Sequence, residues 1–570
     1  MIRPLRSSPA LLDRSCPPFT PQKTTTTLTP PAASEIDPMS TARGSTVRNP
    51  SAIDPISRIP RHLLPCLLAW LFTSFATSYA AELKLPAVFC DHMVLQREKP
   101  LAIWGWANPE ESVSVSFAGH VRTATASPTG EWSLQLDPLD ASSEPRTLTV
   151  TGQADRKLEV KDVLVGEVWF GSGQSNMAMS VGEAAHFDEE KTQADQPHIR
   201  YFGESSGPAE TPQRDGKGAW QICSPTTVRR FSATLYFFGR EIHRELGVPI
   251  GLIASAVGAT HIESWIPADA QSADPETRGE YETSLKGWTH FDEEKIRADH
   301  PKRLSAWQLA VEQGKATLKD KPWPPETTIA HVRRKGPPAG LFNGKVYHLA
   351  PFPLRGILWY QGESNAGAPD LYHKHLSQLV TSWRALWKDE LPFAWVQLPN
   401  FTAPGEGWPR IREAMLKTLA LPRTGMAVTI DLGDPKDIHP KNKQDVGKRL
   451  SLWALGTVYK KSVSTVSGPL PIDSTVRGET IVVSFNHASG GLRSTSGRRL
   501  AGFQIAAADR HWLDAEATIE GETVVIRNAE IRHPVAARYA WKDLPEISLT
   551  NAAGLPATPF RTDDWPTTKK

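Results

Sequence analysis

Five apolar runs, separated by segments of helical periodicity, constrain the fold of this chain more than any other feature. The runs occupy residues 163–170, 250–254, 356–360, 393–398 and 426–432. Between them, apolar side chains recur at the spacing of one helix face, as in Leu235, Phe238, Ile242 and Leu246. Buried strands that alternate with helices predict a doubly wound α/β domain, in which ligands bind at the carboxyl ends of parallel strands. We assign residues 161–456 to this domain.

Short alternating runs, punctuated by turn residues, flank the α/β domain on both sides. Residues 113–117 alternate as Val-Ser-Val-Ser-Phe, and residues 480–485 are rich in β-branched side chains. Such runs are typical of sandwiches, so we predict an N-terminal β-sandwich over residues 81–160 and a C-terminal β-domain over residues 457–570. A charged segment with several prolines, residues 272–340, is expected to be a partly helical insertion.

The first eighty residues have the composition of an extension followed by an export signal. Residues 1–60 are rich in Pro, Ser and Thr without a hydrophobic period, which predicts a disordered extension. Residues 61–80 place an apolar run after Arg61 and end in a small-x-small triplet, as a secretory signal peptide does. The protein is then exported, to the periplasm or beyond. A transmembrane anchor is the alternative, which Pro65 disfavours, and Met39 is an alternative translation start.

Charge and cysteine usage exclude several classes of function. The 64 Lys and Arg against 62 Asp and Glu give a net charge of +2, which leaves no electrostatic footprint for nucleic acid. The four cysteines stand at isolated positions, which argues against a zinc ribbon or a disulfide framework. Cys90 and Cys223 lie beyond the signal, and whether they pair stays open. We therefore predict no metal site, no nucleic-acid partner and no membrane contact beyond the export signal; the oligomeric state is open.

A serine follows the first predicted strand of the α/β domain. Residues 171–177 read Gly-Ser-Gly-Gln-Ser-Asn-Met, which puts Ser175 between a strand and a helix, where backbone N–H groups stabilise negative charge. Met177 stands where a GxSxG elbow has its second glycine. Ser175 therefore has two interpretations, a nucleophile or part of an ordinary capped turn.

Three further strand ends carry polar groups that suit a serine hydrolase. The last strand leads into a loop with His439 beside acidic residues, and a histidine oriented by a carboxylate can accept the serine proton. Gly258 follows the second strand, and Gln361 and Asn365 follow the third. A backbone N–H and side-chain amides on separate loops can form an oxyanion hole. Each group also has a structural alternative, such as helix entry, a tight turn or a helix cap.

These motifs resemble the SGNH (GDSL-type) hydrolases and, more closely, the sialate O-acetylesterase family. The matching stretches are residues 91–97, 166–170, 173–177, 359–365, 437–440, 538–541 and 551–556. The resemblance covers nearly the whole chain beyond the signal. It implies an SGNH-hydrolase (flavodoxin-like) domain that hydrolyses acetyl esters on sugars without a cofactor, so an O-acetylated carbohydrate is the expected partner.

Carried over by this resemblance, the family's roles fall on five residues. Ser175 matches the nucleophile and His439 the general base. Gly258 matches the oxyanion glycine of the second block, and Gln361 or Asn365 takes the role of the third-block donor.

The chain departs from the family pattern at two places. The superfamily's acid stands three residues before the histidine, where this chain has Lys436, so Asp437 is the expected acid and Asp434 the reserve. The second block reads Val257-Gly258-Ala259, where the family has a tryptophan followed by consecutive glycines.

Aromatic residues beside the motifs suggest how a sugar is held. Trp265 lies on a loop and is the candidate for stacking on a sugar ring, whereas Trp169 and Trp359 lie within strand runs and are expected in the core. We therefore predict an exported carbohydrate O-acetylesterase with a Ser/His/Asp acyl-enzyme mechanism. The alternative is a non-catalytic carbohydrate-binding protein of the cell envelope, which needs no Ser175/His439 pair. A lipase-like esterase fits less well, because the insertion shows no apolar lid pattern.

Overall fold

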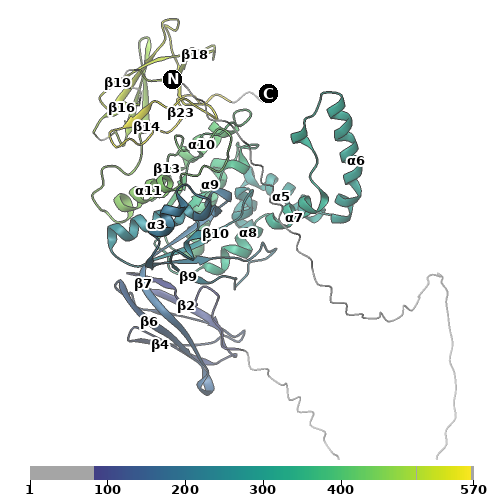
Figure 1. Ribbon diagram of the computed structural model, residues 1–570, viewed down its shortest axis with the longest axis vertical. Helices are drawn as coiled ribbons and strands as arrows, with labels where there is room; N and C mark the ends of the chain where they lie inside the picture. The colour runs from purple at the N-terminus through teal and green to yellow at the C-terminus, as the bar shows by residue number, and fades with distance from the viewer. Residues whose placement is uncertain (1–81, 489, 496, 498, 567–570) are drawn as a thin grey trace, which may run out of the picture. The chain divides into compact units, whose positions relative to one another are not determined.

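The computed structural model of the protein describes residues 82–488, 490–495, 497 and 499–566 (Figure 1). The predicted extension, residues 1–60, and the predicted signal peptide, residues 61–80, lie outside the described residues. Within the described ranges, none of the helices combines the length and the apolar character needed to span a bilayer.

A large mixed sheet forms the centre of the fold. Its order is β13-β12-β11-β7-β10-β8-β9, with β9 antiparallel to β8 and the other neighbours parallel. The strands are β7 (Lys157–Gly173), β8 (Gln196–Gly203), β9 (Trp220–Cys223), β10 (Ile250–Ala256), β11 (Gly356–Tyr360), β12 (Phe393–Val396) and β13 (Thr424–Ala427). The predicted α/β class is confirmed. The sequence pattern missed β8 and β9, and the last predicted run leaves the sheet after Ala427.

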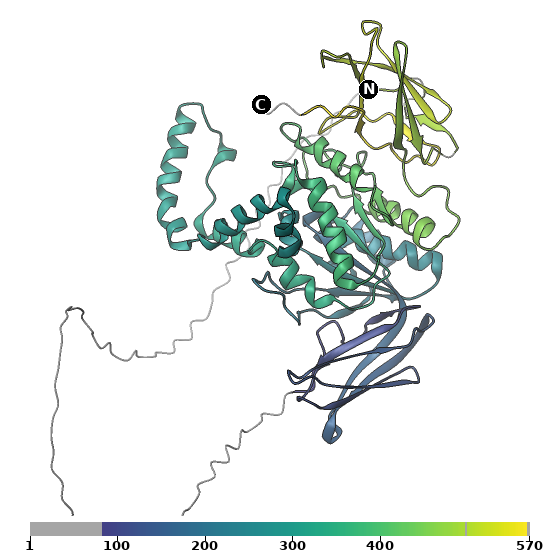
Figure 2. The ribbon, with the colours of Figure 1, turned by 180° about the vertical axis from the view of Figure 1, so that it is seen from behind.

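Helices cover both faces of this sheet (Figures 1 and 2). Neighbouring residues of β7 point to opposite sides: Trp169 joins a core with α3 and α11, and Phe170 joins a core with α9 and α10. The four helices are α3 (Ala233–Leu246), α9 (Tyr372–Trp387), α10 (Gly407–Thr418) and α11 (Lys443–Trp453). Helix α3 follows the expected apolar face, and it begins where Ser232 Oγ accepts a hydrogen bond from Leu235 N (3.4 Å).

Strands before the central sheet build a β region that shares β7 with it. The first half of β7 pairs antiparallel with β6, and the second half pairs parallel with β10 and β11. One continuous strand therefore crosses positions 160 and 161, where the sequence predicts a domain boundary. The other strands are β1 (Val94–Gln96), β2 (Leu101–Trp106), β3 (Ser112–Phe117), β4 (His120–Thr125), β5 (Glu131–Leu136) and β6 (Ser142–Thr151).

Strands after the central sheet form three small antiparallel sheets around their own core, which includes Phe485, Phe503 and Tyr539. The orders are β14-β15-β20-β19, β18-β17-β21-β23 and β16-β22. The strands are β14 (Leu470–Arg477), β15 (Thr480–Asn486), β16 (Leu492–Ser494), β17 (Phe503–Ala506), β18 (Trp512–Asp514), β19 (Glu516–Glu520), β20 (Thr523–Arg527), β21 (Ala536–Tyr539), β22 (Leu549–Asn551) and β23 (Phe560–Arg561). Flanking β structure on both sides of the α/β sheet is thus confirmed.

The predicted insertion is largely helical. No residue of its longest helix, α6, is buried. Pro325 begins α7, where the sequence suggested a proline-rich loop. The remaining helices are α1 (Ser175–Ala178), α2 (Phe187–Thr192), α4 (Ala268–Ala273), α5 (Pro275–Thr289), α6 (Glu293–Glu312), α7 (Pro325–Lys335) and α8 (Gly340–Lys345).

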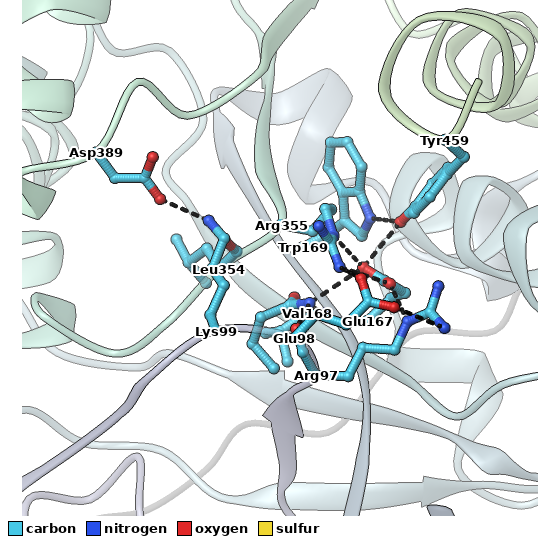
Figure 3. A network of polar contacts seen from close by, with 11 residues as sticks. Arg97, Glu98, Lys99, Glu167, Val168, Trp169, Leu354, Arg355, Asp389 and Tyr459 are labelled. Atoms are coloured by element: carbon cyan, nitrogen blue, oxygen red, sulfur yellow. Dashed lines mark hydrogen bonds and ion pairs between the residues drawn. The ribbon is translucent and has the colours of Figure 1, made fainter. Parts of the chain in front are cut away.

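A buried ionic network lies at the amino end of the parallel strands (Figure 3). Glu167, fully buried on β7, accepts hydrogen bonds from Arg97 Nε (2.5 Å), Arg355 Nε (2.6 Å) and Tyr459 OH (3.1 Å). The network joins β7 to the segment after β1, to the residue before β11 and to the chain after α11. Two of the motifs noted in the sequence, residues 91–97 and 166–170, thus contribute to assembly of the fold.

Candidate active site

Ser175 lies at the carboxyl end of β7 as the first residue of α1. The turn before it depends on Gly173, which has φ 143° and approaches the neighbouring strand so closely that an added Cβ would lie 2.1 Å from Tyr360 O. The Ser175 side chain is half-buried. Its hydroxyl makes no hydrogen bond with any of the residues that the structure describes.

The loop after β10 lies against the nucleophile. Val257 N donates to Gly173 O (3.1 Å), and a Cβ added to Gly258 would lie 3.4 Å from Ser175 Cβ and 3.9 Å from Ser175 N. Gly258 thus lies beside Ser175 with no side chain between them.

The side chain of Asn176 holds the serine and histidine segments together. Its Nδ2 donates to Ile438 O (3.0 Å) and to Glu363 Oε1 (2.5 Å), and its Oδ1 accepts from Lys443 Nζ (2.6 Å). Ile438 immediately precedes His439, and Asn176 immediately follows Ser175. Ser175 and His439, the two predicted catalytic residues, are therefore the chain neighbours of two residues that share a hydrogen bond, Asn176 and Ile438.

Asp437 is the acid that lies close to the imidazole of His439. Their Nδ1 and Oδ1 atoms are 3.7 Å apart, and His439 N also donates to Asp437 Oδ1 (2.9 Å). The reserve candidate, Asp434, instead accepts from Lys436 N (2.8 Å) and is exposed. Burial lowers the pKa of His439, although Asp437 opposes the shift, so the ring is neutral at pH 7 and can accept a proton. The hydrogen bond from His439 N lowers the pKa of Asp437.

The amides of Gln361 and Asn365 have other partners than an oxyanion. Gln361 is fully buried, and its Nε2 donates to Thr260 O (3.1 Å) and Asn365 Oδ1 (2.7 Å). Both of its N–H groups are thus used within the protein. Asn365 Oδ1 also accepts from Ile262 N (3.1 Å), and its Nδ2 donates to Glu263 Oε1 (2.9 Å). These amides fasten the loop after β10 to the loop after β11, and the expected oxyanion contact of Gln361 does not fit this geometry.

Trp265 does not offer a face to a sugar ring. It lies in the 3₁₀ helix η4 (Ile262–Trp265) and has no exposed surface. Its Nε1 donates to Thr260 Oγ1 (3.1 Å), and its ring packs edge-on against Trp359, with ring centroids 5.9 Å apart. The expected sugar contact is replaced by a role in the core, because the loop that carries Trp265 folds back over β11.

The sequence assigned no role to Glu363 and Lys443, which with Asn176 form a buried cluster beside Ser175. Burial raises the pKa of Glu363 and lowers the pKa of Lys443 to about 7. Glu363 lies inside the motif at residues 359–365, and Asn176 directly follows Ser175. Their positions in the sequence could therefore have marked both as candidate site residues. Lys443 carried no such signal, because its contact forms only when α11 packs against α1.

Comparison with known proteins identifies relatives of this chain. A family model described as carbohydrate esterase, sialic acid-specific acetylesterase, matches residues 165–298 and 344–454. The first segment contains Ser175 and Gly258, and the second contains Glu363 and His439. The sialate O-acetylesterase of Mus musculus is 29% identical over 524 residues, which cover 82% of this chain and 92% of that protein. The sialate O-acetylesterase of Homo sapiens is 27% identical over 518 residues, with coverage of 82% and 90%.

A solved structure resembles the chain over most of its length. XAC1771, a carbohydrate acetylesterase from Xanthomonas citri, is 33% identical and superposes with a TM-score of 0.72. The match covers 85% of this chain and 100% of that one. The match is therefore long enough to include both the central sheet and the flanking β regions.

Proposed function

Because the chain belongs to the carbohydrate esterase family of sialic acid-specific acetylesterases, we propose that it hydrolyses acetyl esters on carbohydrates with Ser175 as the nucleophile. The observation that carries this proposal is the pair of hydrogen bonds from the buried Asn176 side chain, which hold the Ser175 turn against the His439 loop and Glu363. The relatives named above, from Mus musculus and Xanthomonas citri, are acetylesterases and support the same reaction class.

The proposed reaction uses an acyl-enzyme. Ser175 Oγ attacks the acetyl carbonyl carbon while His439 accepts the hydroxyl proton, and Asp437 stabilises the resulting imidazolium. The N–H groups of Ser175 and Gly258 bind the oxyanion. The tetrahedral intermediate collapses, and the sugar oxygen leaves with the proton from His439. Water, deprotonated by His439, then attacks the acetyl-serine and releases acetate.

The strand order supports placing the domain among the SGNH hydrolases. Six parallel strands lie in the order β8-β10-β7-β11-β12-β13; with the outer strand β8 set aside, the other five, numbered in chain order, are arranged second, first, third, fourth and fifth. This is the flavodoxin-like order of doubly wound sheets, in which the site lies at the carboxyl ends beside the switch point between the first and third strands. Ser175 follows the first of these strands, and the motif with Glu363 follows the third.

Acetate release from an O-acetylated sugar tests the proposal. We expect Ser175→Ala to lower kcat by about 10⁴-fold or more without a change in Tm. Ser205→Ala, which alters an exposed serine, is the matched control and keeps full activity. A serine-directed fluorophosphonate should label the wild type and not Ser175→Ala. A wild-type protein that binds sugars and releases no acetate would instead be a non-catalytic binding protein.

The sugar is identified by comparing substrates. A panel that contains O-acetylated sialic acid and acetylated plant polysaccharides, with acetate release as the readout, separates these two substrate classes. The substrate with the highest kcat/KM defines the class.

Export is part of the proposal and is supported by the sequence of residues 61–80. Signal peptidase cleavage after Ala80 would leave Ala81 as the first residue. N-terminal sequencing of the protein recovered from its native cell tests this, and a mature chain that retains residues 61–80 would refute it.

A further inference from the structure

Three ionisable side chains from three separate segments meet outside the proposed catalytic group. They are Glu263 of η4, Glu280 of α5 and His375 of α9. One ligand atom from each lies within 4.8 Å of the other two. His375 Nδ1 is 3.6 Å from Glu263 Oε1, and His375 Nε2 is 3.7 Å from Glu280 Oε2, so neither ring nitrogen is within hydrogen-bond distance of these carboxylates.

Two polar atoms of this cluster are buried without a partner. The side chain of His375 is only 2% exposed, and its Nε2 makes no hydrogen bond with any described residue. Glu263 Oε2 is also a buried atom that makes no hydrogen bond with any described residue. Across the part of the chain that the structure describes, neither Glu263 nor Glu280 forms an ion pair with a lysine or arginine. Leaving such atoms unsatisfied is costly, so the arrangement calls for a cation between them.

We propose that Glu263, Glu280 and His375 bind a divalent transition-metal ion of the Zn²⁺ class. One imidazole and two carboxylates are a donor set that zinc accepts, whereas Mg²⁺ and Ca²⁺ take oxygen ligands. Ligand atoms placed about 2 Å from a shared ion are up to about 4 Å apart, so small side-chain rotations close the site. The Glu280 side chain is 35% exposed, which gives the ion a path from solvent and leaves a coordination position for water.

The ion would connect the insertion to the loops around Ser175. Asn365 Nδ2 donates to Glu263 Oε1 (2.9 Å) and therefore orients a proposed ligand from the motif after β11. Glu263 follows Gly258 on the loop after β10, and Glu280 lies on α5 of the insertion. We infer a structural role for this site: it fixes α5 against the two loops that border the active site. Burial and the charge of Glu263 raise the pKa of Glu280, as expected for two carboxylates placed together.

Zinc titration of the chelator-treated full-length protein tests this proposal by calorimetry. We expect one equivalent of Zn²⁺ to bind with micromolar affinity or better, and Glu280→Gln and His375→Gln to weaken binding by about tenfold or more. Glu282→Gln is the matched control, because Glu282 is exposed on the same helix. Zn²⁺ should also raise the Tm of the wild type and of Glu282→Gln, and leave that of Glu280→Gln unchanged.

Two results would overturn the metal site. One is the absence of Zn²⁺ binding to the wild type, which would make the cluster an acid–histidine group without an ion. The other is equal affinity in the wild type and in Glu280→Gln, a variant whose partly exposed position preserves folding. Since the readouts are metal binding and Tm, neither result bears on the proposed esterase activity.

Discussion

The Asn176 side chain connects three segments around the proposed catalytic residues. Its side chain bonds to the loop of His439, to Glu363 and to Lys443, and it is fully buried. Such a residue positions others, because a displacement of about 1 Å between reacting groups can cost a hundredfold in rate.

We expect Asn176→Ala to lower kcat by about ten- to a hundredfold, because the His439 loop loses its hydrogen bond to the serine segment. The KM should change less than kcat. Asn528→Ala is the control: Asn528 also makes side-chain hydrogen bonds, but within the C-terminal β region. It should lower Tm and leave kcat unchanged. Equal kcat values in Asn176→Ala and the wild type would contradict this role.

Lys443 makes stability depend on pH. Its pKa is lowered from 10.5 to about 7 by burial, so between these values the folded protein has lost a proton that the unfolded chain retains. The free energy of unfolding therefore gains up to about 1.4 kcal/mol per pH unit from this group between pH 7 and 10. In Lys443→Met this contribution disappears. Urea unfolding at several pH values measures the difference, and parallel pH profiles for the two proteins would count against the shifted pKa.

At the level of elements, α3 packs on β7 at a distance set by glycine. A Cβ added to Gly171 would lie 2.5 Å from Leu235 Cδ1 on α3. The contact is to an apolar side chain in a filled core, which has little freedom to move.

We expect Gly171→Val to destabilise the protein by about 1–3 kcal/mol, because the added methyl groups push α3 away from the sheet. Gly279→Ala is the matched control, since Gly279 lies on α5 with no atom near a new Cβ. That change should stabilise the protein by about 0.5–1 kcal/mol through helix propensity. Urea unfolding distinguishes the two; a neutral Gly171→Val would show that the helix and sheet are loosely packed.

The strands and helices that the sequence predicted are those whose hydrophobic pattern is visible within the element itself. Buried strands such as β10 and β11 are continuous apolar runs, and α3 shows a clear apolar face. Strand β8 was missed because polar residues interrupt it, including the buried Arg200, whose guanidinium bonds to Asp162. The positions of Ser175, just after β7, and of His439, on the loop between β13 and α11, follow from the same local reasoning. The partners of Gln361 and Trp265 do not, because they come from loops that meet only in the folded chain.

For the whole molecule, the network around Glu167 joins segments that lie far apart along the described chain. Arg97, Arg355 and Tyr459 converge on one buried carboxylate (Figure 3). Removing one member of a buried charged group leaves the others desolvated and unpaired, which costs far more than loss of an exposed pair.

We expect Glu167→Gln to lower the free energy of unfolding by about 3–5 kcal/mol, because Arg97 and Arg355 lose their counter-charge. Glu98→Gln is the control, since Glu98 contacts the same two arginines but has a half-exposed side chain. Its cost should stay below about 1 kcal/mol. Urea unfolding of both variants measures the contrast, and a similar small effect from each would mean that the network contributes little.

Because β7 belongs to two β regions, it limits where the genes of homologous proteins can recombine and still encode a folded protein. Its early residues complete the first β region, and its late residues lead directly to Ser175. Recombination between two homologous genes near codon 160 would join the first half of β7 from one protein to the second half from the other. The two halves would not have evolved together, although each half is hydrogen-bonded to other strands. Successful hybrids should therefore have their crossover points before β6 or after α1, and the N-terminal β region should be inherited together with the nucleophile.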